Sequence, residues 1–209
     1  MNGKLAAADT TARENILSRI KSGLPKAVEL PEIPMYRIKG DVVENFIRHL
    51  ESFDGTCKRF ARRKDAIEWL HDNIDPGKAT VYSSVEGFEG NFTVRTDTDP
   101  HSANVVDICI GEGEIGVGET GSVWVTEKSL GLTACALFST DLYLLLDINN
   151  LYEGIHQAYE ALNLRDIRYG AFFTGPSATA DIEAVRVTGA QGEITLTVLL
   201  TGELPGESF

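Results

Sequence analysis

The sequence has few cysteines and lacks any grouping of them that binds metal. Cys57, Cys109 and Cys135 are far apart, and none belongs to a Cys-x-x-Cys pair. Zinc sites and iron–sulfur clusters need such grouped thiolates. We therefore expect that this chain binds no metal and no cofactor of its own, and that its thiols are buried and reduced, as in cytoplasmic proteins.

Long apolar runs and an excess of basic residues are also missing. No stretch approaches the ~20 apolar residues that span a membrane, and the polar start has no apolar signal segment. With 19 basic and 31 acidic residues the net charge is -12, which repels phosphate backbones and anionic lipid surfaces. These features argue against nucleic-acid and membrane partners and favour a cytoplasmic location.

One basic cluster stands out against this acidic background. It consists of Lys58, Arg59, Arg62, Arg63 and Lys64. Such a cluster could receive an anionic ligand or an acidic partner, but a solvated loop followed by a helix start is the more common structure and is favoured here. The four histidines have no His or Cys neighbour at ligand spacing, so we expect surface or packing roles for them.

The length of 209 residues fits one domain with a small appendage. A capping-box pattern that starts at Thr11 predicts a short amphipathic helix, which ends near Gly23. Prolines in residues 25–40 predict an extended linker. We therefore divide the chain into an N-terminal helix with its proline-containing linker, residues 1–40, and an α/β domain, residues 41–209.

The rest of the chain alternates helical patterns with strand patterns. Apolar residues at helical spacing predict helices at about 41–52, 64–73 and 151–162. Runs rich in β-branched and aromatic residues predict strands at about 56–60, 79–83, 105–110, 115–117, 122–126, 142–148, 169–174, 184–188 and 193–201. The continuous apolar run at 142–148 indicates a central strand. This order predicts an α/β fold whose mixed or parallel sheet carries helices on its faces.

Residues 84–104 are polar and show neither helical nor strand periodicity. Irregular segments of this length in a compact domain often serve as lids or binding loops. The alternative is a poorly ordered insertion, and the sequence alone does not decide between the two.

The first segment that could carry chemistry is Gly116–Gly121, which matches the pattern GxGxxG. A dinucleotide fingerprint must open a helix, whereas residues 122–126 have a strand pattern, so we interpret the segment as a hairpin turn. Glu119 has little shielding from its glycine neighbours and could act as general base or nucleophile. The surrounding residues would then bind the ligand: Gly118, Thr120 and Gly121. A solvent-exposed turn residue is the more frequent role on spacing alone.

The second segment is the corner formed by Gly175, Pro176 and Ser177, with Thr179 and Asp181 just beyond it. Free backbone amides after a strand form an anion cradle, to which the two hydroxyl groups would add donors. Asp181 could orient a hydroxyl group or a water molecule. In the alternative interpretation the hydroxyls only satisfy local amides in a capped turn, and the residue types favour neither.

Together the two segments resemble the LUD domain of the LutC/YkgG lactate-utilisation proteins. The matching stretches are residues 13–20, 106–107, 118–122, 175–183, Gly189 and 196–200. The resemblance implies a three-layer α/β/α mixed sheet, like that of the ribose-phosphate isomerase and CoA-transferase superfamily, with the N-terminal helix as an extension. It also implies a role in the oxidation of lactate to pyruvate beside iron–sulfur oxidoreductase subunits, which would hold the clusters.

The sequence departs from the family pattern after the penultimate strand. Relatives have His-Gly-Pro there, whereas this chain has Gly189-Ala190-Gln191-Gly192-Glu193. Two alternatives therefore stay open. One is an independent CoA-transferase-like or sugar-phosphate-type enzyme that uses Glu119, and the other is a non-catalytic module that binds a small anionic metabolite. Both alternatives are compatible with the sequence pattern, and so is assembly of the chain into a homo-oligomer. All three hypotheses assume that the Glu119 turn and the Gly-Pro-Ser corner lie side by side.

Overall fold

The computed structural model describes residues 3–25, 28–29, 31–34, 37–95, 97–180, 183, 185–189 and 192–203. Contacts divide the chain into two units, Met1–Met35 and Tyr36–Phe209. The first unit contains helix α1 (Gly3–Gly23). The predicted end at Gly23 is confirmed, but the predicted start at Thr11 is wrong. Alanines precede Thr11, and their high helix propensity extends the helix toward the N-terminus. Within the described part of the chain, no helix has the length and apolar character needed to cross a membrane.

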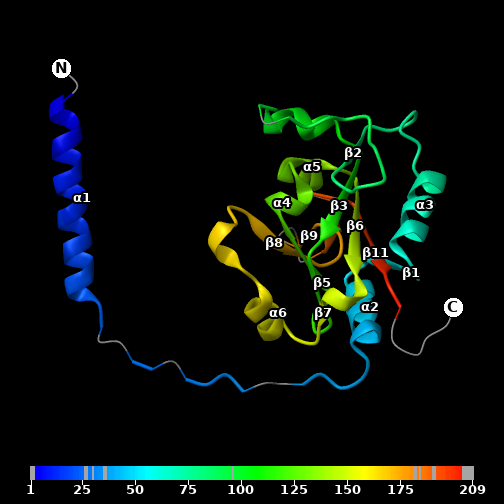
Figure 1. Ribbon diagram of the computed structural model, residues 1–209, viewed down its shortest axis with the longest axis horizontal. Helices are drawn as coiled ribbons and strands as arrows, with labels where there is room; N and C mark the ends of the chain where they lie inside the picture. Colours follow the sequence, from blue (N-terminus) through cyan, green and yellow to red (C-terminus); the bar gives the residue numbers. More distant parts are fainter. Residues whose placement is uncertain are drawn as a thin grey trace. The chain divides into compact units, whose positions relative to one another are not determined.

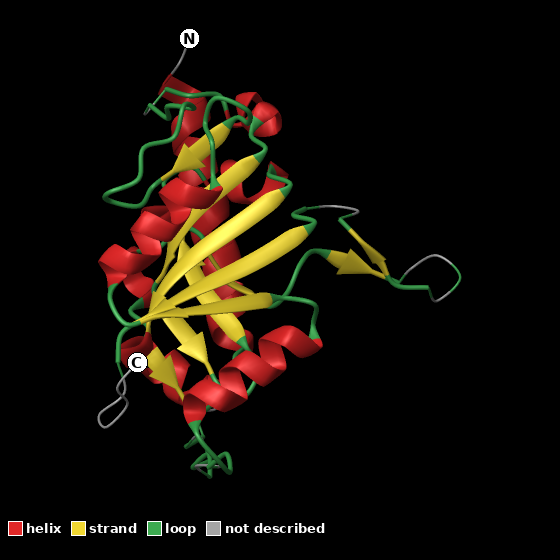
Figure 2. Ribbon diagram, turned by 90° about the vertical axis from the view of Figure 1, so that its right-hand side faces the viewer, coloured by secondary structure: helices red, strands yellow, loops and turns green. Residues whose placement is uncertain are grey.

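The second unit is built on a parallel sheet of five strands in the order β1-β11-β6-β3-β2. These strands are β1 (Thr56–Phe60), β2 (Val81–Ser83), β3 (Ile108–Gly113), β6 (Asp141–Asp147) and β11 (Thr195–Thr201). The central position of β6 confirms the prediction from its apolar run. Figure 2 shows the twist of this sheet between its flanking helices.

Four further strands form a second sheet in the order β7-β4-β5-β8. They are β4 (Ile115–Val117), β5 (Ser122–Thr126), β7 (Leu151–Tyr152) and β8 (Gly170–Phe173). The antiparallel pairing of β4 with β5 confirms the predicted hairpin and the rejection of a dinucleotide fingerprint. The sequence pattern had not separated this sheet from the first, because strand patterns report local alternation and not the partner strand.

The two remaining strands, β9 (Ala178–Thr179) and β10 (Val187–Thr188), form a short antiparallel ribbon in the part of the chain that the structure describes. This ribbon stands apart from the two larger sheets (Figure 2). It follows the Gly-Pro-Ser corner directly, so it carries the chain away from the corner and back to the start of β11.

Helices cover both faces of the five-stranded sheet, which confirms the predicted α/β class (Figure 1). They are α2 (Val42–Ser52), α3 (Arg63–Asn73), α4 (Glu127–Leu130), α5 (Thr133–Phe138) and α6 (Ile155–Ala161), with short 3-10 turns η1 (Pro100–Val105), η2 (Ile148–Asn150) and η3 (Leu164–Asp166). One face packs on α3. The other packs on α2, α4, α5 and the four-stranded sheet, whose outer face is covered by α6.

Helix α2 follows directly from the sequence. The Asp41 side chain accepts hydrogen bonds from the amides of Val43 and Glu44 and thereby caps the helix. Val43, Phe46 and Leu50 recur at spacings of three and four residues and are fully buried in the main core. Each such side chain contributes roughly 1.5–3 kcal/mol by its burial. The predicted helix at 41–52 is therefore confirmed.

The irregular segment after β2 protects the free edge of the five-stranded sheet. The Asn91 side chain accepts a hydrogen bond from the amide of Val81 at 2.7 Å, and the amide of Phe92 donates to the Val81 carbonyl at 2.9 Å. Exposed strand edges promote aggregation, and covering them with a loop is a common remedy. This part of the segment therefore covers the sheet edge, and a role of the segment as a lid or binding loop stays a prediction.

Two glycine bends touch the backbone of α2 directly. Gly121, with φ +68°, lies so close that a Cβ atom there would be 2.1 Å from the amide nitrogen of Leu50. Gly175, with φ +66°, lies against the end of the helix, where a Cβ would be 2.0 Å from the carbonyl oxygen of Phe53. Only glycine combines this left-handed conformation with such a close approach.

We expect Gly121→Ala to destabilise the protein by about 2 kcal/mol or more, because left-handed strain adds to a clash with the backbone of Leu50. Urea denaturation followed by circular dichroism measures the loss. Gly23→Ala is the matched control, since a Cβ there meets nothing within 4 Å. Equal stability of the two variants would contradict the close packing of α2 on this turn.

Candidate functional site

The Glu119 turn joins β4 to β5 and contacts the start of α6. Two backbone hydrogen bonds fix the turn. The amide of Gly118 donates to the Tyr152 carbonyl at 2.8 Å, and the amide of Glu119 donates to the Glu153 carbonyl at 2.9 Å. The Glu119 carboxylate accepts a hydrogen bond from the amide of Ile155 at 3.0 Å. An anionic group at this position satisfies a free amide and complements the positive end of the helix. Glu119 therefore has a helix-capping role in the structure.

A chain of hydroxyl groups connects the Glu119 turn to the Gly-Pro-Ser corner. The Ser122 hydroxyl donates to Thr120 Oγ1 at 2.7 Å and also contacts Thr174 Oγ1. Thr174 immediately precedes Gly175, and strands β5 and β8 are antiparallel neighbours. The expected proximity of the two bends is thus present, at one end of the four-stranded sheet.

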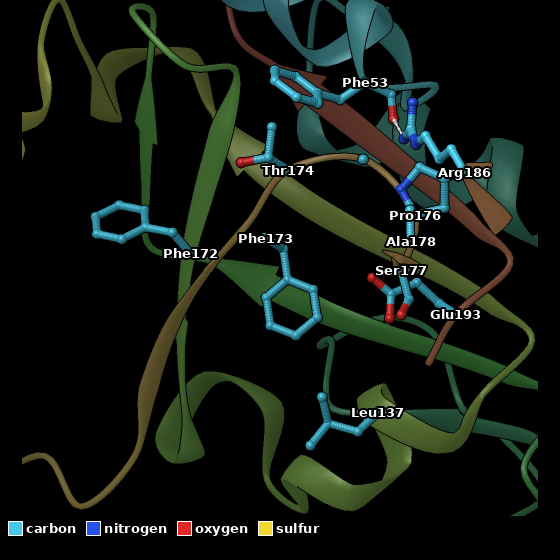
Figure 3. A pocket seen from close by; sticks show the side chains of 11 residues that line it. Phe53, Leu137, Phe172, Phe173, Thr174, Pro176, Ser177, Ala178, Arg186 and Glu193 are labelled. Carbon is cyan, nitrogen blue, oxygen red and sulfur yellow. Dashed lines mark hydrogen bonds between the residues drawn. The ribbon is translucent and has the colours of Figure 1, made fainter. Parts of the chain in front are cut away.

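A cavity of about 590 Å³ opens beside the Gly-Pro-Ser corner (Figure 3). Its lining comprises residues 172–178 together with Phe53, Leu137, Arg186 and Glu193. None of these residues belongs to the Glu119 turn. Gly175, Pro176 and Ser177 line the cavity as predicted contacts of a ligand would, whereas Gly118, Glu119, Thr120 and Gly121 do not.

Glu193 supplies the buried carboxyl group of this cavity. Only 4% of the residue is exposed, and the Ser177 amide donates to its backbone carbonyl at 3.0 Å. Burial raises the pKa of the Glu193 carboxyl above its ordinary value of 4.5. A carboxyl group with a raised pKa beside a cavity can give or take a proton, as acid–base sites require. The nearby Tyr169 hydroxyl also has a raised pKa, through its burial and the charge of Glu193.

Arg186 places a cation at the same cavity. Its guanidinium group contacts Asp54 at 2.9 Å and donates to the Phe53 carbonyl at 3.3 Å. Toward the residues that the structure describes, these two contacts use only part of the five N–H donors of the guanidinium group, and the side chain is substantially exposed. Because Arg186 is anchored at one side, it can present its remaining donors to a carboxylate ligand.

Two predicted site residues lie beyond the corner. Thr179 is part of β9, where it pairs with Val187 of β10. Asp181 lies outside the described residues, so its proposed role in orienting a hydroxyl group stays a prediction.

Comparison with known proteins places this architecture in a family. A model described as the LUD domain matches residues 95–201, just over half of the chain. The chain belongs to the LUD domain family. A crystal structure of a DUF162 family protein from Deinococcus radiodurans has a TM-score of 0.57 at 13% sequence identity, over 77% of this chain and 96% of that one. That likeness concerns the fold. No curated protein matches the chain.

The LUD domain match includes Glu119, the Gly-Pro-Ser corner and Glu193. Sequence reasoning missed Glu193, although this residue ends the segment Gly189–Glu193, where the sequence departs from the pattern expected for the family. That departure was the one signal available. Ordinary residue spacing gave none, because Glu193 and Ser177 meet only through tertiary contacts.

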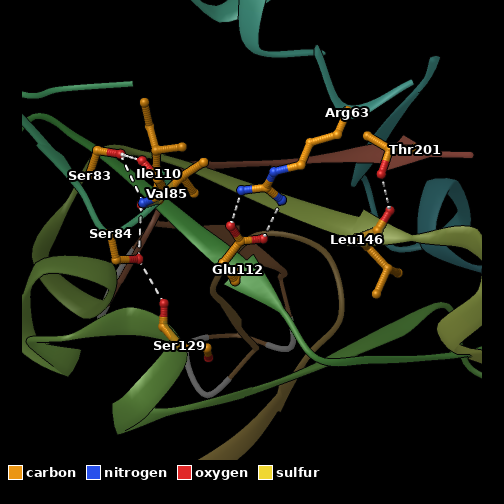
Figure 4. A network of polar contacts seen from close by, with 9 residues as sticks. All are labelled: Arg63, Ser83, Ser84, Val85, Ile110, Glu112, Ser129, Leu146 and Thr201. Atoms are coloured by element: carbon orange, nitrogen blue, oxygen red, sulfur yellow. Dashed lines mark hydrogen bonds and ion pairs between the residues drawn. The ribbon is translucent and has the colours of Figure 1, made fainter. Parts of the chain in front are cut away.

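The basic cluster of this LUD domain protein lies on and around the start of α3 and is largely occupied by carboxylates. Arg62 binds Asp65 at 2.6 Å, and Lys64 binds Glu68 at 3.2 Å. Arg63 forms a two-bonded ion pair with Glu112 of β3, which Figure 4 shows above the five-stranded sheet. These pairs support the interpretation of a solvated loop and helix start.

His49 and the cysteines have packing roles, whereas His101 and His156 are exposed. His49 Nδ1 lies 2.7 Å from the carbonyl oxygen of Gly118 and links α2 to the hairpin. Burial raises the pKa of the Cys57 thiol to about 12 and that of Cys135 to about 11, so neither is a thiolate near neutral pH. Within the described residues, no group of three His, Cys, Asp or Glu side chains is placed to hold a metal ion.

We expect Glu119→Ala to cost about 1 kcal/mol of stability, because the amide of Ile155 loses its partner. Glu119→Gln retains an oxygen acceptor and should lose less than half as much. Urea denaturation of both variants measures the difference. Identical losses in the two variants would show that the hydrogen bond to α6 contributes nothing.

Glu193 should make stability depend on pH in a defined direction. Its folded pKa is raised, so the folded state binds more protons than the unfolded state once pH exceeds about 4.5, and the free energy of unfolding falls as pH rises through the folded pKa. Glu193→Gln removes this fall, so the stability of the variant relative to that of the wild type should increase as pH rises. Denaturation curves at several pH values test this; a constant difference between the proteins would contradict it.

Proposed function

We propose that this LUD domain protein is a LutC-like, cytoplasmic component of lactate utilisation that acts with iron–sulfur partner proteins in the oxidation of lactate to pyruvate. Membership of the LUD domain family carries the proposal, since the family is associated with lactate utilisation. Oxidation of lactate to pyruvate releases two electrons and two protons. In this proposal the electrons pass to the clusters of the partner proteins, and this chain holds the organic acid.

The cavity supports a small organic acid as ligand. Arg186 provides a cation for a carboxylate, while Ser177 provides a hydroxyl group that can bind either a hydroxy acid or an oxo acid. The buried Glu193 carboxyl lies against the same space and can exchange a proton. A concave site with a few convergent polar groups among apolar walls is the usual form of a metabolite pocket.

Exposed apolar side chains close in sequence to residues that line the cavity support a protein partner. They are Phe138 of α5, Val185, Val187 of β10 and Ile194, which precedes β11. Large apolar side chains left exposed become buried when another molecule covers them. A two-stranded ribbon is also marginally stable by itself in water, which adds to the need for a cover.

Deletion of the gene should abolish growth on lactate while growth on pyruvate continues, and the tagged protein should co-purify with cluster-bearing proteins. Val187→Asp should reduce that co-purification at least about fivefold, because it places a charge on the apolar surface. Leu164→Asp is the matched control: this leucine is also exposed but lies in η3, outside the ribbon of β9 and β10.

Undiminished growth of the deletion strain on lactate would overturn the proposed function. The second candidate, an independent small-molecule enzyme, would then be preferred. The specific observation in its favour is the buried carboxyl of Glu193 at the cavity, a more suitable acid–base group than Glu119, whose carboxylate caps α6.

A further inference from the structure

The cavity at the Gly-Pro-Ser corner is several times larger than lactate. Its volume is about 590 Å³. Given that a water molecule takes about 30 Å³ in the liquid, a lactate ion takes on the order of 100 Å³. The cavity opens to solvent, so part of a ligand can stay hydrated. Even so, lactate alone would leave most of the apolar lining in contact with water.

Three large apolar side chains of this lining are Phe53, Leu137 and Phe173. Phe53 and Leu137 are 49% and 37% exposed, although both border the cavity, and Phe173 forms its more buried wall. Figure 3 shows these side chains around the same space as Ser177 and Glu193. Large apolar groups left open at a cavity gain free energy when a ligand removes them from water.

The polar groups lie close to this apolar lining. The Arg186 guanidinium group donates a hydrogen bond to the backbone carbonyl of Phe53, and the Ser177 amide donates one to the backbone carbonyl of Glu193. Gly192 lies between Ser177 and Leu137: a Cβ on Gly192 would be 2.9 Å from Ser177 Cβ and 3.8 Å from the Leu137 carbonyl oxygen. Because Phe53, Leu137 and Phe173 line the same cavity as these polar groups, a ligand in the cavity can contact both.

We infer that the cavity selects 2-hydroxy or 2-oxo carboxylates whose apolar side group is much larger than the methyl group of lactate. This inference rests on the proposed function, which supplies the hydroxy-acid head group; the cavity supplies the preference for a larger side group. The carboxylate binds at Arg186, the oxygen on the second carbon binds near Ser177, and the side group packs on Leu137 and Phe173.

Isothermal titration calorimetry with the full-length protein tests the preference. The ligands are lactate, 2-hydroxybutyrate, 2-hydroxyhexanoate and 3-phenyllactate, each as a single enantiomer. We expect the association constant to rise with side-group size, by up to about fourfold for each buried methylene group, and by about tenfold or more between lactate and 2-hydroxyhexanoate. Equal or falling constants along the series would overturn the inference.

Leu137→Ala assigns the preference to this cavity. It should lower the association constant of 2-hydroxyhexanoate by about threefold to tenfold, a larger loss than it causes for lactate. Leu164→Ala, which removes the same atoms from an exposed leucine outside the cavity, should change neither constant. Equal effects of the two substitutions would show that larger acids bind elsewhere and would overturn the assignment.

The outcomes separate this inference from the proposed function. If lactate binds and deletion of the gene abolishes growth on lactate, but no size preference appears, the inference fails and the proposed function stands. If the larger acids bind strongly while the deletion strain still grows on lactate, the proposed function fails and the cavity's preference stands. Absence of binding by every acid in the series overturns the inference as well.

Discussion

The close contact between α2 and two glycine bends is the constraint on which the rest of this structure depends. The helix buries Val43, Phe46 and Leu50 in the main core, so its position is fixed by a large apolar contact. Its backbone then leaves room only for hydrogen at Gly121 and Gly175. Because both bends contact the same helix, they are held at one end of the four-stranded sheet. The contact at the second bend therefore also fixes the position of the cavity beside it.

Two carboxyl groups in this LUD domain protein show how environment assigns a role. Glu119 is exposed and accepts a hydrogen bond from the start of α6, so its charge serves to cap a helix. Glu193 is almost fully buried beside a cavity, where loss of solvation raises its pKa. The residue type is the same in both cases. Acid–base function favours the second group, because a carboxyl group whose charged form is disfavoured exchanges its proton nearer to neutral pH.

Local patterns carried much of the prediction. The strands at 56–60, 115–117 and 122–126 have the predicted bounds, since each alternates or runs apolar between clear turn residues. The helix predicted at 151–162 is shorter, because Leu151 and Tyr152 pair with β4 as a strand before the helix begins at Ile155. Short helices α4 and α5 escaped prediction: four and six residues are too few for a periodic pattern to emerge.

The sequence by itself determined the α/β class, the hairpin in place of a dinucleotide fingerprint, the central strand and the resemblance to the LUD domain family. These depend on residues close together in the chain, whose spacing records their local structure. Only the tertiary structure decided that the strands divide into two sheets and that Glu193, rather than Glu119, lines the cavity at the Gly-Pro-Ser corner. Those features depend on which distant segments pair, and the free energy of such pairing comes from packing that no local pattern records.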